Sequence, residues 1–289
     1  MLSLTHIINP VKVTTTSDLY VAQPITFETM KRAKGYVNGR VHVDLVTAQF
    51  EEDKEIIPGY FQTTPNLERS VLDIGSFQIP RKLPLLNDIL ERAYQFNPDA
   101  DYLIYTNVDI ALQPHFYDFV SQQIEKGLDA FVINRRTISK EHSLEGLENA
   151  YKDLGEKHPG FDCFVISQAV YSKICLNKVA IGISKVGITL LANLMVFAEH
   201  FMLFEEEHLT FHIGADKVWQ NPKFHDYFLH NCKEAYKTYQ WLQTVNSRIK
   251  TNPIFEKHWK LLEMELCQEK PTPQKTTSNL LKRMVKKWR

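Results

Sequence analysis

Short apolar segments rich in branched side chains alternate along the chain with segments in which apolar residues recur at helical spacing. The first kind predicts buried strands, and the second predicts helices that pack on a sheet. Expected strands lie at 6–11, 40–47, 101–108 and 129–134. Strands that read as continuous apolar runs and are separated by helices are typical of a largely parallel sheet. The pattern therefore predicts an α/β fold with a mostly parallel sheet flanked by helices.

Two helices are expected to separate the later strands of this sheet. The first follows Pro84, which suits the opening turn of a helix because its missing N–H would be unpaired there. The second follows Pro114 and ends at Gly127, where a left-handed residue is expected. The apolar positions that define the two helices are Leu86, Ile89, Leu90, Ala93 and Tyr94, and then Phe116, Phe119, Val120 and Ile124.

The regular alternation breaks after residue 134, which predicts an α+β elaboration in the second half of the chain. The apolar span 186–198 is shorter than the roughly 20 residues that cross a bilayer, so it predicts a buried helix. Aromatic-rich spacing from residue 221 onwards predicts a helical C-terminal region. We expect one large domain over 1–266, followed over 267–289 by a Pro- and Thr-rich linker and a basic amphipathic tail.

Composition and charge narrow the classes of protein. With 289 residues and 44% hydrophobic residues, the chain is long enough to bury a substantial core. Seven of the 34 Lys and Arg lie in the last 20 residues, which leaves 27 against 34 acidic residues, so the body is mildly acidic and does not resemble a general nucleic-acid binder. Four dispersed cysteines without a CxxC pair, and no apparent signal peptide, predict a cytoplasmic protein with reduced thiols.

The segment "YLIYTNVDIAL" is a buried strand that ends in polar residues, Asn107 and Asp109. In open α/β sheets the ligand crevice lies outside the carboxyl ends of the strands. Two oxygen-bearing side chains two residues apart at such a point can bind one hard divalent cation, to which a diphosphate supplies further ligands. The alternative is that Asn107 caps a turn and Asp109 begins the next helix or solvates a loop.

In these features the chain resembles the nucleotide-sugar-dependent glycosyltransferases of GT-A fold, which carry an Asp-x-Asp-type motif after a buried central strand. The resemblance covers roughly the first two thirds of the chain and lies in the order of the elements. It implies a Rossmann-like, GT-A-like catalytic domain that transfers a sugar from a nucleotide-diphosphate sugar to an acceptor hydroxyl, with Mn²⁺ or Mg²⁺ at the diphosphate. Asn107 departs from the motif, because the family usually has a carboxylate there.

The same resemblance implies that His212 returns to the cation as a third ligand beside Asn107 and Asp109. The alternative is a partly buried histidine that bonds to the backbone. Asp162 follows a tight Pro-Gly turn and precedes an apolar run, where a carboxylate can be held at the wall of a cleft. We expect Asp162 to bind the acceptor or to act as general base, and the alternative is an aspartate that bonds turn amides.

Several further residues are candidates for contact with the nucleotide. Arg135 and Arg136 follow the strand at 129–134, where one of them can pair with a phosphate through two hydrogen bonds. Arg81 and Lys82 precede the helix after Pro84, in the region where the resemblance implies contact with the nucleotide. Asp44, near the end of the second strand, is a candidate for the base or ribose. The alternative for all five is ordinary surface solvation.

The tail sets apolar side chains on one helical stripe and basic side chains on the other, which suits an anionic membrane surface. Such contact favours a glycan, lipid-linked or small-molecule acceptor near the membrane. A nucleotidyltransferase is disfavoured because "INPVKVTTTSDLY" has no Gly-rich phosphate loop, and neither GxGxxG nor GxxxxGK[ST] occurs. A non-catalytic nucleotide-sugar-binding module of the same fold remains open because of the asparagine at 107.

Overall fold

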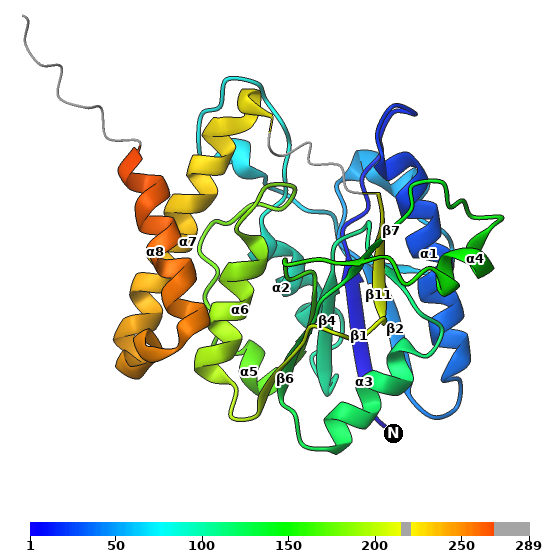
Figure 1. The fold of residues 1–289 in the computed structure, drawn as a ribbon. Coiled ribbons are helices and arrows are strands. Elements are labelled where there is room, and N and C mark those ends of the chain that lie inside the picture. The colour runs from blue at the N-terminus through cyan, green and yellow to red at the C-terminus, as the bar shows by residue number, and fades with distance from the viewer. Residues whose placement is uncertain (215–220, 269–289) are drawn as a thin grey trace, which may run out of the picture.

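A seven-stranded sheet forms the centre of the protein in the computed structural model, which describes residues 1–214 and 221–268 (Figure 1). Its strand order is β10-β6-β9-β4-β1-β2-β3. Neighbouring strands are parallel except at β9, which is antiparallel to both β4 and β6. The predicted α/β fold with a mostly parallel sheet is confirmed. The strands are β1 (Ser3–Ile8), β2 (His42–Thr47), β3 (Gln62–Thr63), β4 (Tyr102–Thr106), β6 (Ala130–Ile133), β9 (Cys163–Ser167) and β10 (Phe201–Phe204).

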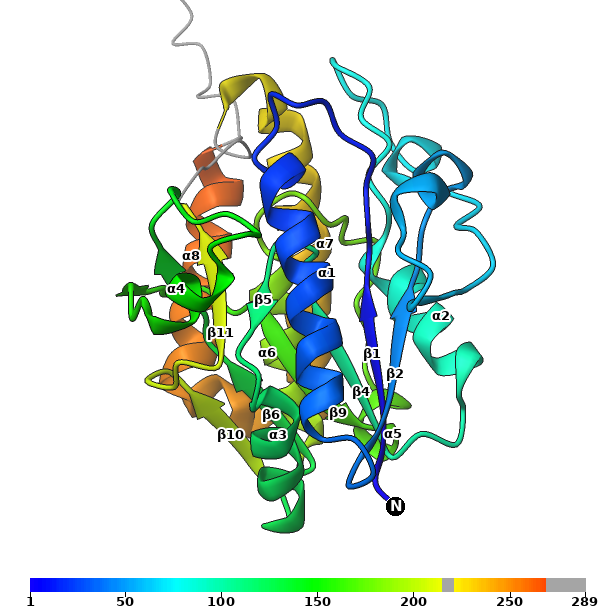
Figure 2. The same cartoon turned by 90° about the vertical axis from the view of Figure 1, so that its right-hand side faces the viewer.

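Helices cover both faces of the large sheet. Because side chains alternate along a strand, Ile8 of β1 packs in the apolar cluster that contains α1 and α3, whereas Ile7 packs in the cluster with α2 and α6. Figure 2 shows α1 lying along its face of the sheet. The central strands are therefore buried on both sides, as their continuous apolar runs require. These helices are α1 (Leu19–Tyr36), α2 (Leu86–Phe96), α3 (Phe116–Glu125) and α6 (Val186–Phe197), with the short α5 (Gln168–Tyr171) after β9.

Two long helices, α7 and α8, form a further layer outside α6 (Figure 1). Tyr239 and Leu242 of α7 and Phe255 and Leu262 of α8 are buried in one cluster with Ala192 of α6. The apolar span at 186–198 is thus a helix that is packed between the sheet and this layer, as predicted. Within the described ranges, no helix has both the length and the apolar character needed to span a membrane. The outer elements are η4 (Pro222–Phe224), α7 (His225–Val245), η5 (Ser247–Thr251) and α8 (Pro253–Gln268).

A second, four-stranded sheet with the order β5-β11-β7-β8 is the α+β elaboration expected after residue 134. Strand β11 pairs parallel with β7 and antiparallel with β5. This pairing brings a late segment of the chain beside the segment that follows β4. The elements are β5 (Ala111–Leu112), β7 (Arg136–Ile138), α4 (Leu147–Lys152), β8 (Glu156–Lys157) and β11 (Thr210–Ile213), and the first half of the chain also contains η1 (Glu51–Ile56) and η2 (Val71–Asp73).

Helix α1 was not predicted, because polar residues interrupt its apolar spacing. Gln23, Thr26 and Thr29 are buried in it, and Pro24 lies inside it. The Gln23 side chain bonds to both the N–H and the carbonyl of Val11, and Thr29 Oγ1 accepts from the Leu112 N–H. These long-range contacts satisfy Gln23 and Thr29, although not the Thr26 hydroxyl, and they leave no periodic signal in the sequence.

Candidate active site

The carboxyl ends of β4 and β6 and the start of β9 meet at one edge of the large sheet. In the antiparallel register, Cys163 lies opposite both Thr106 and Ile133. The next residues towards this edge are Asn107, which follows β4, Asn134, which follows β6, and Asp162, which precedes β9. These three residues form what we call the edge row.

The edge row lies on the α2 and α6 side of the sheet. Residues directly opposite each other in antiparallel strands share a face, and every second residue of a strand returns to that face. Tyr105 and Phe164, two positions before Asn107 and after Asp162, pack in the cluster with α2 and α6. The Tyr105 hydroxyl donates to Asn107 Oδ1 at 2.8 Å, which fixes the amide at the end of β4.

Asp109 and His212 form a pair beside this row. His212 lies on β11, and its Nε2 is 3.2 Å from Asp109 Oδ2. His212 Nδ1 is 2.8 Å from the carbonyl oxygen of Gly214, and a carbonyl can only accept, so Nδ1 carries a proton. Nε2 can donate to Asp109 only if the ring carries both protons. Otherwise two lone pairs face each other, which is the arrangement in which a histidine and a carboxylate share a cation.

The Asp109 side chain is partly exposed, and its carboxylate is only half satisfied. Its side chain is 24% exposed, so the pair with His212 is not sealed inside the protein. Its Oδ1 is buried and has no hydrogen-bond partner within residues 1–214 and 221–268. Burial raises the pKa of Asp109, but the hydrogen bond and charge of His212, together with the charge of Arg135, outweigh burial and hold this pKa below its ordinary value. Asp109 therefore stays an anion.

Asp162 differs from Asp109 in the balance of the same forces. Its Oδ2 lies 3.4 Å from Arg135 Nε, and both side chains are 13% exposed. Burial raises the pKa of Asp162, the charge of Arg135 opposes this, and the charge of Asp109 adds to it, so the pKa of Asp162 lies above its ordinary value. Two neighbouring carboxylates whose pKa values are displaced in opposite directions are typical of sites that divide charge stabilisation from proton transfer.

The residues fit a divalent cation as a partial site. Asp109 offers an unpaired oxygen, and His212 has the backbone-carbonyl contact on Nδ1 that orients Nε2 for a metal. Asn107 Oδ1 already accepts from Tyr105. Over the described part of the chain, no three His, Cys, Asp or Glu side chains come together in a way that could hold a metal ion. A cation here would need further oxygen ligands from the substrate.

Comparison with known proteins concerns the fold. No protein-family model and no curated protein matches the chain. Among solved structures, residues 1–349 of Staphylococcus aureus TarS, in complex with UDP-GlcNAc, align with 8% identity over 90% of this chain and 79% of that one, at a TM-score of 0.49.

Two other solved structures align with this chain at low identity. A protein described as a nucleotide-diphospho-sugar transferase from Desulfovibrio desulfuricans aligns with 12% identity over 92% of this chain and 99% of that one, at a TM-score of 0.37. The 4-diphosphocytidyl-2C-methyl-D-erythritol synthase of Anaerococcus prevotii aligns with 10% identity over 79% of this chain and 98% of that one, at a TM-score of 0.39. The chemistry of this chain has to be argued from its own residues.

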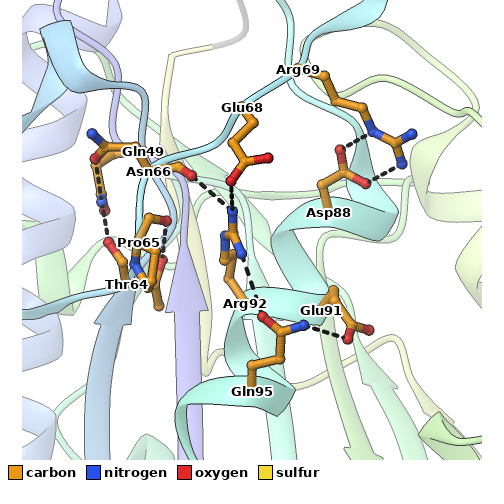
Figure 3. Close-up of polar contacts among 10 residues, drawn as sticks. All are labelled: Gln49, Thr64, Pro65, Asn66, Glu68, Arg69, Asp88, Glu91, Arg92 and Gln95. Carbon is orange, nitrogen blue, oxygen red and sulfur yellow. Dashed lines mark hydrogen bonds and ion pairs between the residues drawn. The ribbon is translucent and has the colours of Figure 1, made fainter.

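A loop fixed by polar contacts lies beyond the end of β2 (Figure 3). The buried Gln49 amide accepts from the Thr47 hydroxyl at 2.7 Å and donates to the Thr64 carbonyl at 2.7 Å. From α2, Arg92 donates to the Asn66 carbonyl at 2.8 Å. Two hydrogen bonds of 2.8 Å join Arg69 and Asp88. These contacts hold the segment 64–69 against α2 at the ligand-facing edge of the sheet. The sequence prediction did not include Gln49.

The structure does not bring every predicted residue to this site. Asp44 is the third residue of β2, three positions and about 10 Å before the strand end, and its carboxylate accepts from Gln62 and Asn97. The expectation that Asp44 lies at the end of the strand is wrong. Arg136 donates to the carbonyls of Leu154 and Gly155. It therefore joins β7 to the segment before β8 and does not face the edge row.

Arg81 and Lys82 are held by different parts of the protein. The Arg81 guanidinium lies 4.4 Å from the centre of the Phe224 ring, and burial lowers the pKa of Arg81. Lys82 Nζ pairs with Glu52 at 2.6 Å and lies 4.0 Å from the centre of the Phe50 ring. Because Phe50 and Glu52 follow β2, Lys82 remains a candidate for contact with an anionic ligand at that edge, and Arg81 has a packing role.

Gly187 determines how closely α6 approaches the segment that carries Asp162. A Cβ at Gly187 would lie 2.5 Å from the carbonyl oxygen of Phe161. Replacing Gly187 by alanine is therefore expected to displace one of the two segments and to cost about 1–3 kcal/mol in the free energy of unfolding, measured by urea denaturation.

The matched control for this substitution is Gly35→Ala in α1. Nothing lies within 4 Å of a Cβ at Gly35. Alanine there is expected to stabilise the helix by up to about 1 kcal/mol. If the two variants had the same stability, the close approach of α6 to Phe161 would be refuted.

Proposed function

We propose that this protein transfers a sugar from a nucleotide-diphosphate sugar to an acceptor hydroxyl. The observation that supports the proposal most directly is the Asp109–His212 pair at the carboxyl ends of the strands, with one Asp109 oxygen unpaired among the described residues. The ligand crevice of an open α/β sheet lies at this edge. An anion and an imidazole at that point suit the cation that accompanies a diphosphate.

In this mechanism Asp109 and His212 would hold Mn²⁺ or Mg²⁺, with Asn107 beside them. When bound, the cation supplies neutralisation of the charge that develops on the leaving nucleoside diphosphate. Asp162 accepts the proton of the acceptor hydroxyl as the hydroxyl oxygen bonds to the anomeric carbon and the bond from that carbon to the diphosphate oxygen breaks. Arg135 holds the Asp162 carboxylate in place by its charge.

The decisive experiment is a thermal-shift panel of UDP, GDP, CDP and their sugars with Mn²⁺ or Mg²⁺. A nucleoside diphosphate at 100 times its Kd is expected to raise the Tm of the wild type by about 5 °C in the presence of the cation. Asp109→Ala is expected to stay folded and to lose this shift, because it loses the carboxylate that residues 1–214 and 221–268 contribute to the cation site.

A second aspartate with the same kind of partner provides the control. Asp153 Oδ2 lies 2.7 Å from His142 Nε2, outside the edge row. Asp153→Ala should keep the nucleotide-dependent shift. Equal shifts in wild type and Asp109→Ala would reject the cation site. Binding without sugar transfer or hydrolysis would indicate a nucleotide-sugar-binding module, and release of pyrophosphate from a nucleoside triphosphate and a sugar phosphate would indicate a nucleotidyltransferase.

We also propose that the protein is cytoplasmic and that its basic tail contacts the anionic face of a membrane. The tail prediction lies outside the described residues, and the division into 1–266 and 267–289 remains a prediction. Each Lys or Arg near an anionic surface contributes roughly 1 kcal/mol. The full chain is expected to float with anionic vesicles, whereas a chain that ends at Cys267 should not. Equal flotation of both chains would refute the proposal.

A further inference from the structure

Asn134 is a buried polar residue that the fold leaves unsatisfied. It directly follows β6 in the edge row, and it is only 3% exposed. Its Oδ1 has no hydrogen-bond partner in the described ranges, and the same holds for Asp162 Oδ2 and Asp109 Oδ1. Three buried oxygen atoms that accept no hydrogen bond from the described residues therefore lie where β4, β9 and β6 meet the ligand edge, and one of them, Asp162 Oδ2, faces Arg135 Nε at 3.4 Å.

Other buried asparagines of this protein are satisfied. Asn231, which is fully buried, accepts from the Ala180 N–H and donates to the carbonyls of Ala180 and Ser184. Asn193, also fully buried, accepts from the Cys175 N–H and donates to the Cys175 carbonyl. An unpaired buried acceptor destabilises the folded state. Asn134, which differs from these asparagines and lies at the ligand edge, is therefore a candidate to accept a hydrogen bond from a ligand.

We propose that Asn134, together with Asp162 and Asn107, binds the ring hydroxyl groups of a sugar. Each hydroxyl can donate to one of these oxygens and accept from a neighbouring N–H. Arg135 Nε supplies such a donor next to Asp162, since it too makes no hydrogen bond to the described residues. Amide and carboxylate oxygens in a row on one face suit the hydroxyl groups of a sugar ring, which can donate, better than an ionised phosphate, whose oxygens only accept.

This inference rests on the proposed glycosyl transfer and names the part of the substrate that the row recognises. The sugar can belong to the donor or to the acceptor, since both present hydroxyl groups. A donor sugar would make Asn134 contribute to the affinity for a nucleotide sugar but not for its nucleoside diphosphate. An acceptor sugar would make Asn134 contribute to the KM of the acceptor alone.

The test compares wild type, Asn134→Leu and Thr5→Val. Thr5 is a matched control because it is fully buried on β1, its Oγ1 is also without a hydrogen-bond partner in the described part, and it lies three residues before the strand end. Calorimetric titrations use UDP, UDP-glucose, UDP-GlcNAc, GDP and GDP-mannose. Saturation-transfer NMR uses free glucose, GlcNAc and mannose.

Asn134→Leu is expected to weaken sugar binding roughly three- to tenfold, the effect of losing one net hydrogen bond. Its affinity for UDP or GDP should be unchanged, and its Tm should be no lower than that of the wild type, because no satisfied hydrogen bond is lost. Thr5→Val should bind every probe as the wild type does. A lost preference for the nucleotide sugar identifies the donor, and a raised acceptor KM identifies the acceptor.

The proposal is overturned if Asn134→Leu binds the sugars and turns over the acceptor as the wild type does, or if it loses stability as a structural asparagine would. It is also overturned if the wild type binds none of the sugar probes. A further outcome separates the two proposals. If no nucleoside diphosphate binds but free sugars bind in a way that depends on Asn134, the transferase proposal is refuted and sugar binding by the edge row is supported. The two proposals can therefore fail separately.

Discussion

Replacing Asp162 by asparagine is expected to abolish most sugar transfer while it makes the folded protein more stable at neutral pH. The amide cannot take the proton of the acceptor hydroxyl, so turnover should fall by about 10²- to 10⁴-fold. Burial raises the pKa of Asp162, so its ionised form is disfavoured in the folded state despite Arg135. Removing that charge is therefore expected to raise the stability of the folded protein, which is seen as a higher Tm.

The pH dependence of this stability gain has a definite sign. The folded Asp162 carboxyl binds its proton more tightly than the unfolded one, whose pKa is near 3.8. Wild-type stability from this group therefore falls as pH rises through the raised pKa. The Tm difference between Asp162→Asn and wild type should be smallest near pH 4 and largest at neutral pH, by differential scanning calorimetry.

Two results would contradict this account of Asp162. Unchanged turnover in the asparagine variant would remove Asp162 from the role of base. A lower Tm at neutral pH would show that the contact with Arg135 outweighs burial, and Asp162 would then be a structural ion pair.

Replacing Phe164 by alanine is expected to have the largest effect on stability. Phe164 is fully buried on β9, and in the register it lies opposite both Tyr105 of β4 and Val132 of β6. Truncation should cost about 3–5 kcal/mol, a large share of the 5–15 kcal/mol by which domains are usually stable. Urea denaturation measures the loss.

The control for Phe164 is Tyr20→Ala, because the Tyr20 side chain is 53% exposed. That change should stay within about 0.5 kcal/mol of the wild type. A loss below about 1 kcal/mol for Phe164→Ala would mean that the contacts across β9 do not hold the sheet together.

The local pattern of the sequence predicted four of the parallel strands, β1, β2, β4 and β6, and the polar residues after β4, but it did not predict β3 or β10. Asn107 and Asp109 were found because an apolar run leads directly into them. The same reasoning applies to Asn134, which ends "DAFVIN". Only the two arginines that follow it were predicted as site residues. His212 was linked to Asp109 only through the family resemblance, and the pairing of β11 with β5 gives that link a structural basis.

Other features depend on long-range contacts that leave no local signal. Asp162 was placed at a cleft wall from its Pro-Gly turn, but the sequence does not show that β9 runs opposite to its neighbours. That direction puts the beginning of β9, and not its end, at the ligand edge. Asp44 was misplaced because an apolar run does not reveal which of its residues is the last in register. Helix α1 was not predicted, because buried polar residues such as Gln23 and Thr29 interrupt its apolar spacing and bond to backbone groups outside the helix.

The reversed strand β9 also sets the order in which the chain can assemble on the ribosome. Strands β4 and β6 are not neighbours, so β6 and β10 join the rest of the sheet only through β9. A nascent chain that has not yet released residues 163–167 leaves the edge of β4 open to other chains, which is a risk for aggregation. The strand that closes this gap also carries Asp162 at its start, so one step of biosynthesis joins β6 to β4 and brings the proposed base to the sheet.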